Sequence, residues 1–130
     1  MPIPRRTVVI VEDDVAMRQA TERVLAVRGI TAKTFPTAEA ALAGGVAHAS
    51  CLIVDVRLPG ISGLELCERI AREGTLPPLI FITAHDEPHV HAAARRLGAV
   101  SVLVKPFSGR DLADAVANIL ARRKSRAGHA

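Results

Sequence analysis

Short apolar segments alternate with amphipathic segments along the whole chain. Most of the apolar segments are nearly continuous runs of Val, Ile and Leu, as expected for strands that are covered on both faces. None of these runs approaches the length of about 18 residues that a membrane-spanning helix needs. The pattern predicts five strands, at residues 7–11, 30–35, 51–54, 79–83 and 100–104.

Helical periodicity follows each predicted strand. Ser62 and Ser108 each precede an acidic residue at the spacing of a capping box, so each is expected to begin a helix. Thr37 is suited to cap a short Ala-rich helix that ends before Gly44. The apolar spacing predicts which side chains of the other four helices face inwards. These are Met17, Ala20, Thr21 and Val24; Gly63, Leu66, Cys67 and Ile70; Val90, Ala93, Ala94 and Leu97; and Leu112, Val116, Ile119 and Leu120.

This alternation predicts the α/β class. Five strands that alternate with five helices through short loops form a single parallel sheet with helices on both faces, the doubly wound (βα)5 arrangement. The length of 130 residues matches one domain. We expect that domain to occupy residues 7–121, with an N-terminal tail at 1–6 and a basic C-terminal tail, or the start of a linker, at 122–130.

Basic residues are concentrated in the two tails. The chain carries 17 Lys and Arg against 13 Asp and Glu, a formal net charge of +4. The tails hold six of the basic residues, which leaves the body with 11 basic and 13 acidic residues, a net charge of −2. A phosphate-binding face would carry its Lys and Arg in the folded body. Direct DNA binding by this chain is therefore not expected.

Cysteine use and the N-terminus point to the cytoplasm. Cys51 and Cys67 both lie in apolar segments, which is typical of buried thiols in a reducing compartment rather than of a disulfide framework. The first six residues lack the apolar stretch of a secretory signal. We expect a cytoplasmic protein that makes no use of a membrane.

Polar side chains stand at the ends of four of the predicted strands. Glu12 and Asp13 follow the first strand, Asp55 follows the third, Thr83 ends the fourth, and Lys105 follows the fifth. The carboxyl ends of parallel strands lie at one edge of a sheet, where ligands bind in open α/β folds. We therefore expect these side chains to lie close together.

The combination of these groups predicts phosphoryl transfer. Three neighbouring carboxylates repel one another by about 1–4 kcal/mol per close pair, so either a pKa rises or a cation enters. Oxygen ligands without His or Cys favour Mg²⁺. Lys105 offers a point charge that pairs with phosphate, and Thr83 offers a hydroxyl donor. Because carboxylates are known phosphoryl acceptors, Asp55 is the expected acceptor.

Together with the loop at 58–63, Ala84 and the segment Lys105-Pro106-Phe107, these strand ends closely resemble the receiver domain of two-component response regulators. The resemblance covers residues 7–121. It implies the strand order 2-1-3-4-5 of chemotaxis receivers and a cis peptide bond before Pro106. Receivers that precede a helix-turn-helix output look most similar, which favours a role in transcription regulation.

The resemblance also implies a phosphoacceptor and a metal site. Asp55 would be phosphorylated by a sensor histidine kinase or a phosphotransfer protein. Asp13 and Asp55 would bind Mg²⁺ or Mn²⁺ directly, Glu12 would act through a water, and Arg57 would contribute its backbone carbonyl. Asp14 is expected to cap the following helix. Such a chain is a signalling domain that takes part in its own phosphorylation and dephosphorylation, not a conventional enzyme, and homodimerisation is left open.

One position departs from the family pattern. Thr83 and Lys105 would contact the incoming phosphoryl group, but the residue three before Lys105, usually Tyr or Phe, is Val102 here. The sequence therefore does not identify which surface of the domain reports phosphorylation. A receiver-like interaction module that works without phosphorylation is the alternative.

Two other interpretations have little support in the sequence. A nucleotide- or flavin-binding domain needs a Gly-rich turn after the first strand, where this chain carries acidic residues. The spacing of His85, His89 and His91 suits a metal, but no cysteine or further ligand cluster accompanies them.

Overall fold

A computed structural model describes the backbone of residues 7–129 and the side chains of residues 7–122, so the expected N-terminal tail at 1–6 lies outside the described residues. The strands are β1 (Val8–Val11), β2 (Ala32–Phe35), β3 (Cys51–Asp55), β4 (Leu79–Thr83) and β5 (Ser101–Val104). The helices are α1 (Val15–Val27), α2 (Ala38–Ala43), α3 (Gly63–Glu73), α4 (Pro88–Leu97) and α5 (Gly109–His129), with a 3-10 turn η1 (Val46–His48).

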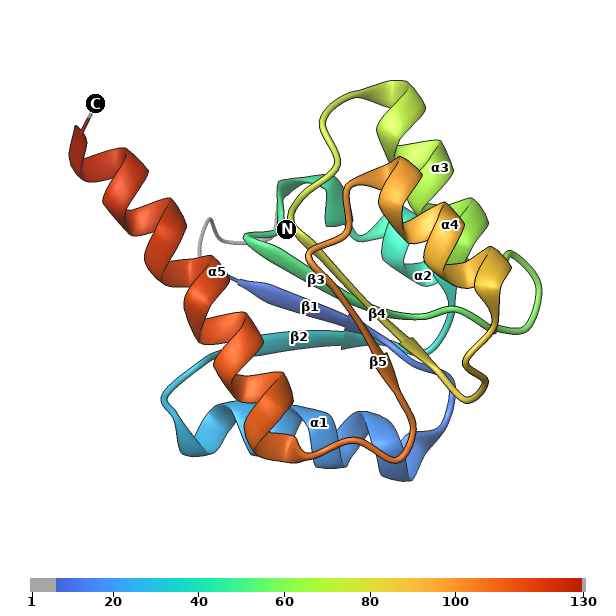
Figure 1. The fold of residues 1–130 in the computed structure, drawn as a ribbon, viewed down its shortest axis with the longest axis horizontal. Helices are drawn as coiled ribbons and strands as arrows, with labels where there is room; N and C mark the ends of the chain where they lie inside the picture. The colour runs from blue at the N-terminus through green and yellow to red at the C-terminus, as the bar shows by residue number, and fades with distance from the viewer. Residues whose placement is uncertain (1–6, 130) are drawn as a thin grey trace.

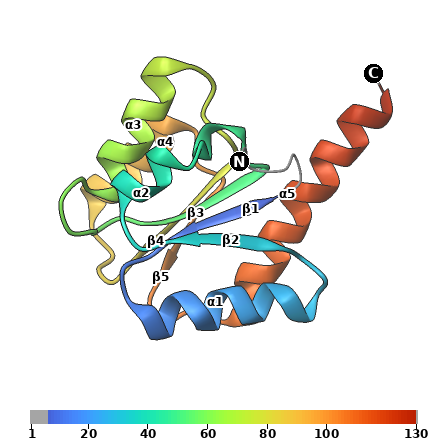
Figure 2. The ribbon, with the colours of Figure 1, turned by 180° about the vertical axis from the view of Figure 1, so that it is seen from behind.

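All five strands pair in parallel in one sheet, in the order β2-β1-β3-β4-β5. The helices α2, α3 and α4 cover one face of the sheet, and α1 and α5 cover the other (Figures 1 and 2). The predicted α/β class, doubly wound arrangement and strand order are confirmed. Within the described part of the chain, no helix has both the length and the apolar character needed to cross a membrane.

The two faces of the sheet form two separate cores because successive strand side chains point in opposite directions. Val9 and Leu52 belong to the core beneath α2, α3 and α4. Their neighbours Val8, Ile10 and Ile53 belong to the core beneath α1 and α5. The central strands are therefore buried on both sides, which explains why their sequences are continuous apolar runs.

Side-chain caps fix the starts of the first three helices. Asp14, Thr37 and Ser62 each accept a hydrogen bond from the backbone N–H three residues later, at 3.0, 3.0 and 3.1 Å. These bonds satisfy N–H groups that have no partner within the helix. The predicted caps are confirmed, and Asp14 is the cap of α1, as expected. Ser108 likewise precedes α5, and its Oγ accepts from the backbone N–H groups of Arg110 and Asp111 at 3.1 and 3.4 Å.

The inward face of α1 differs from the prediction. Ala20 is exposed, whereas Leu25 is fully buried beside Thr21. Helix α1 packs with its Thr21 and Leu25 row inwards, and Ala20 lies on the flank of that row. The predicted inward positions of α3 are all buried, and the two cysteines are buried as expected. Burial, with the nearby charge of Glu68, raises the pKa of the Cys67 thiol to about 12.

Helix α5 continues through residues 122–129 and extends past the sheet, away from the other helices (Figures 1 and 2). The predicted division at 121 into a domain and a basic tail stays a prediction. The expected cis peptide bond between Lys105 and Pro106 is present.

Gly63 lets the start of α3 approach the end of β3 very closely. Its N–H donates to the Val56 carbonyl at 2.9 Å. A Cβ atom at this position would overlap the backbone oxygen of Asp55 and would lie 2.8 Å from Val54 Cγ1. The absence of a side chain at Gly63 therefore fixes how β3 delivers Asp55 to the carboxyl edge of the sheet.

We expect Gly63→Ala to lower the free energy of unfolding by about 1–3 kcal/mol, because backbone and core atoms must move to admit the methyl group. Gly74→Ala is the matched control, since a Cβ atom there meets nothing within 4 Å. It should change stability by less than about 1 kcal/mol. Urea denaturation of both variants measures the difference, and equal stability of the two would contradict this packing.

Candidate functional site

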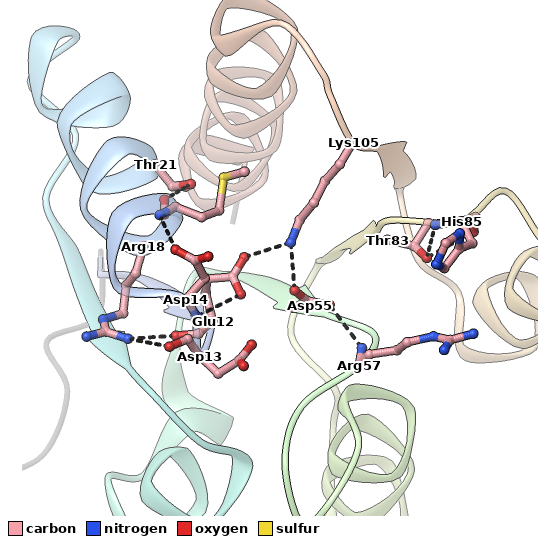
Figure 3. Close-up of polar contacts among 11 residues, drawn as sticks. Glu12, Asp13, Asp14, Arg18, Thr21, Asp55, Arg57, Thr83, His85 and Lys105 are labelled. Carbon is pink, nitrogen blue, oxygen red and sulfur yellow. Dashed lines mark hydrogen bonds and ion pairs between the residues drawn. The ribbon is translucent and has the colours of Figure 1, made fainter.

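Three carboxylates and one ammonium group meet at the carboxyl edge of the sheet (Figure 3). Ligand oxygens of Glu12, Asp13 and Asp55 lie within 4.8 Å of one another. The Lys105 Nζ atom lies 2.9 Å from Asp55 Oδ2 and 3.1 Å from Glu12 Oε1. Loops from β1, β3 and β5 thus bring together four side chains that the sequence places far apart, as the strand-end pattern predicts.

Asp55 is held at both of its carboxylate oxygens. It is the last residue of β3 and is only 6% exposed. Its Oδ1 accepts a hydrogen bond from the backbone N–H of Arg57 at 2.9 Å, while Oδ2 pairs with Lys105. The acceptor expected from the sequence is therefore a buried, oriented carboxylate. The Arg57 main chain lies at this site, but the role of its carbonyl as a metal ligand stays a prediction.

The electrostatics of the site depend on Glu12. Burial, followed by hydrogen bonding with and repulsion from Asp55, raises the pKa of Glu12 to about 7. The Lys105 ammonium and the Asp14 backbone N–H oppose this rise. For Lys105, burial is the largest single influence and lowers its pKa, but the combined pairing with Asp55 and Glu12 outweighs burial and raises it. Lys105 therefore stays charged, while Glu12 is poised between its two forms.

The group of Glu12, Asp13 and Asp55 has the chemistry of a divalent-cation site. All three supply hard carboxylate oxygens, and no His or Cys belongs to the group. Mg²⁺ prefers such oxygens and usually takes only one or two carboxylates along with water. A divalent charge at this position would also relieve the repulsion that raises the pKa of Glu12. The residues present therefore fit the metal that the sequence analysis expects.

Thr83 lies at the end of β4 but is turned towards its own loop. Its hydroxyl donates to the His85 carbonyl at 3.0 Å and accepts from the His85 N–H at 3.2 Å. The side chain is 2% exposed, and Figure 3 shows it to the side of the acidic cluster. Among the described contacts, none joins the hydroxyl to Asp55. The structure brings Thr83 to the correct edge of the sheet without directing it at the acceptor.

Arg18 supports the acidic loop and was not expected from the sequence. Its guanidinium Nη1 donates to the backbone oxygen of Glu12 at 2.9 Å and reaches that of Asp13 at 3.5 Å. The contact holds the loop that carries two of the three carboxylates. An arginine in the first turns of the helix after an acidic loop is the only sequence signal for it, and that signal does not identify the acceptor atoms.

Two histidines next to the site contact acidic neighbours. His91 Nε2 lies 2.5 Å from Asp86 Oδ1, and His89 Nδ1 lies 3.1 Å from Glu87 Oε2. These contacts place His89 and His91 on different carboxylates, at the loop between β4 and α4.

Comparisons with known proteins agree with this geometry. The family model of the response regulator receiver domain matches residues 8–117. Nodulation protein W of Bradyrhizobium diazoefficiens is 38% identical over 120 residues, which cover 92% of this chain and 53% of that protein. The C4-dicarboxylate transport transcriptional regulatory protein DctR of Rhodobacter capsulatus is 34% identical over 127 residues, which cover 95% of this chain and 64% of that protein.

Solved structures show the same similarity. The response regulator receiver protein from Burkholderia phymatum is 36% identical, with a TM-score of 0.76, over 89% of this chain and 95% of that one. The chain spans between about half and two thirds of the length of the curated relatives described above.

The raised pKa of Glu12 predicts a pH dependence of stability in the metal-free protein. The pKa of Glu12 is about 7 in the folded chain, whereas the ordinary value of 4.5 applies to the unfolded chain. Folding therefore favours the protonated form of Glu12. That stabilisation is complete below pH 4.5 and is lost as the pH rises through about 7. Relative to Glu12→Gln, which cannot ionise, the wild type should lose on the order of 3 kcal/mol across this range.

Urea denaturation in a chelator, at several pH values, measures this loss. The exposed Glu22 provides the matched control: wild type and Glu22→Gln should show parallel pH profiles. A difference between wild type and Glu12→Gln that does not vary with pH would contradict the electrostatics described here.

Proposed function

The chain belongs to the response regulator receiver domain family, and from this membership we propose that it is a phosphorylation switch whose acceptor is Asp55. The observation that supports this most directly is the buried Asp55 carboxylate, 2.9 Å from the Lys105 ammonium and clustered with Glu12 and Asp13. The phosphoryl donor would be a sensor histidine kinase or a phosphotransfer protein. The domain signals by changing state, and this distinguishes it from a conventional enzyme.

We propose that the acidic cluster holds Mg²⁺ or Mn²⁺. Asp13 and Asp55 would bind the metal directly, Glu12 through a water, and Arg57 through its backbone carbonyl. When bound, the metal would neutralise the carboxylates and the charge that develops on the transferring phosphoryl group. The three clustered carboxylates, with no nitrogen or sulfur ligand among them, support this assignment.

In the proposed reaction, a carboxylate oxygen of Asp55 forms a bond to phosphorus. The bond between phosphorus and the donor's imidazole nitrogen breaks, and that nitrogen leaves with the electron pair. The product is an acyl phosphate on Asp55 and an imidazole on the donor, which is neutral because its other ring nitrogen carries a proton during the transfer. Lys105, already fixed between Glu12 and Asp55, is placed to pair with the phosphoryl oxygens.

Thr83 would convert phosphorylation into a conformational change. To reach the phosphoryl group, its hydroxyl must give up two contacts with the His85 backbone. Neutral hydrogen bonds contribute about 0.5–1.5 kcal/mol each, whereas bonds to charged groups contribute about 1.5–3 kcal/mol. With Lys105 adding a second charged contact, the exchange becomes favourable, and it displaces the loop that leads from β4 to α4.

The presence of valine at position 102 favours the loop from β4 to α4 as the element that transmits phosphorylation to the surface. Its side chain is half-buried and packs against the core on the α4 face of the sheet. Since valine has no ring to turn inwards, we propose that the displacement of the Thr83 loop carries the signal without an aromatic partner.

Incubation with acetyl phosphate and Mg²⁺ tests the acceptor. We expect a mass increase of about 80 Da, one phosphoryl group, in the wild type and none in Asp55→Asn or after addition of a chelator. Asp111→Asn, at an exposed position outside the cluster, is the control that should still be phosphorylated. An unmodified wild type, or an adduct that survives in Asp55→Asn, would overturn the proposal and favour an interaction module that works without phosphorylation.

We further propose that the protein regulates transcription, as the name of DctR of Rhodobacter capsulatus states for that relative. In the source organism, gene deletion and Asp55→Asn should alter an overlapping set of transcripts, measured by RNA sequencing. No transcript that responds to Asp55→Asn would argue against this output.

A further inference from the structure

Arg57 contacts the phosphoacceptor and the start of α4 at the same time. Its main-chain N–H donates to Asp55 Oδ1 at 2.9 Å. Its guanidinium Nη2 lies 2.9 Å from Glu87 Oε1. Glu87 directly precedes Pro88, the first residue of α4. One residue of the acceptor loop therefore bridges β3 to the element that follows the Thr83 loop.

Glu87 occupies the N-cap position of α4 but does not cap it with its side chain. One carboxylate oxygen pairs with Arg57 and the other lies 3.1 Å from His89 Nδ1. Backbone bonds from Val90 and His91 to the Glu87 carbonyl, at 3.1 and 3.4 Å, hold the first turn. The helices α1, α2 and α3 all have a side-chain cap. At the start of α4 the Glu87 side chain instead pairs with the acceptor loop, beside these backbone bonds and the contact between Asp86 and His91.

We propose that Glu87 is a positioning residue that, through Arg57, holds the start of α4 against the acceptor loop and releases it when Asp55 is phosphorylated. The release rests on the proposed function. Phosphorylation replaces the single charge of the Asp55 carboxylate with a phosphoryl group of charge about −1.5 to −2, so the negative charge beside Arg57 increases. Guanidinium groups pair strongly with phosphate, so the new anion competes with Glu87 for Arg57.

The Thr83 loop acts on the same segment. His85, which Thr83 must release to reach the phosphoryl group, stands two residues before Glu87. Loss of the Arg57 pair frees this segment at one end while movement of Thr83 displaces it at the other. The two events therefore favour the same rearrangement of the start of α4.

The ion pair between Arg57 and Glu87 is suited to shift the equilibrium between a held and a released start of α4, but not to fix the held state permanently. The Arg57 side chain is 65% exposed and that of Glu87 is 31% exposed. Exposed pairs of this kind shift an equilibrium by about twofold to fivefold. A stronger contact would oppose phosphorylation, whereas a bias of this size can be overcome by a few charged hydrogen bonds.

Amide hydrogen exchange of Val90 and His91, followed by NMR in the unphosphorylated protein, tests the holding contact. We expect Glu87→Gln to exchange about twofold to fivefold faster at these amides than the wild type. Arg96→Gln is the matched control, because it breaks another exposed pair of α4, Arg96 with Glu68 at 3.7 Å, and should leave the two amides unchanged.

Exchanging the charges of Arg57 and Glu87 tests whether the attraction between them, rather than the shape of either side chain, slows amide exchange. The double variant Arg57→Glu with Glu87→Arg restores opposite charges and should return exchange at Val90 and His91 towards the wild-type rate, while each single reversal should raise it. Unchanged exchange in Glu87→Gln, or an equal rise in Arg96→Gln, would overturn the proposal.

Phosphorylation with acetyl phosphate and Mg²⁺ tests the release. Exchange at Val90 and His91 should rise in the wild type and rise less in Glu87→Gln, which already lacks the pair. Intact mass is measured on the same samples. A phosphorylated wild type with unchanged exchange overturns the release alone, whereas the absence of a phosphorylated species overturns the proposed function, and the measurement on unphosphorylated protein still decides the holding contact.

Discussion

The repulsion among three carboxylates at one edge of the sheet is the constraint on which the rest of the structure depends. Glu12, Asp13 and Asp55 lie close together because they end or follow the neighbouring strands β1 and β3, which are buried. Lys105 compensates part of this charge, while burial and the neighbouring Asp55 still raise the pKa of Glu12. Under the proposed function, a divalent cation and then a phosphoryl group would relieve this imbalance of charge.

Patterns that depend on local chemistry were readable from the sequence. Buried parallel strands must be apolar on both faces, so the strands and the polar residues at their ends were predicted correctly. The caps of the first three helices followed from residue type, because only a short polar side chain reaches the free N–H groups. Cys51 and Cys67, both in apolar segments, were correctly expected to be buried.

Features that depend on tertiary placement were not readable. The inward face of α1 is set by how the helix lies on the sheet, which is why Ala20 was wrongly expected to be buried. The direction of the Thr83 hydroxyl follows from its loop, and a sequence shows only that a hydroxyl is present. The contacts of Arg18 with backbone oxygens, and of Arg57 with Glu87, join segments whose proximity no motif encodes.

The close approach at Gly63 has a mechanical consequence for signalling. With α3 seated directly on the main chain of β3, the backbone at Asp55 has little room to shift towards α3. Under the proposed function, movement of the acceptor loop is therefore expected to pass to the start of α4, which Arg57 joins to that loop through an exposed ion pair. The absence of a side chain at Gly63 thereby favours movement of the acceptor loop towards α4 rather than towards α3.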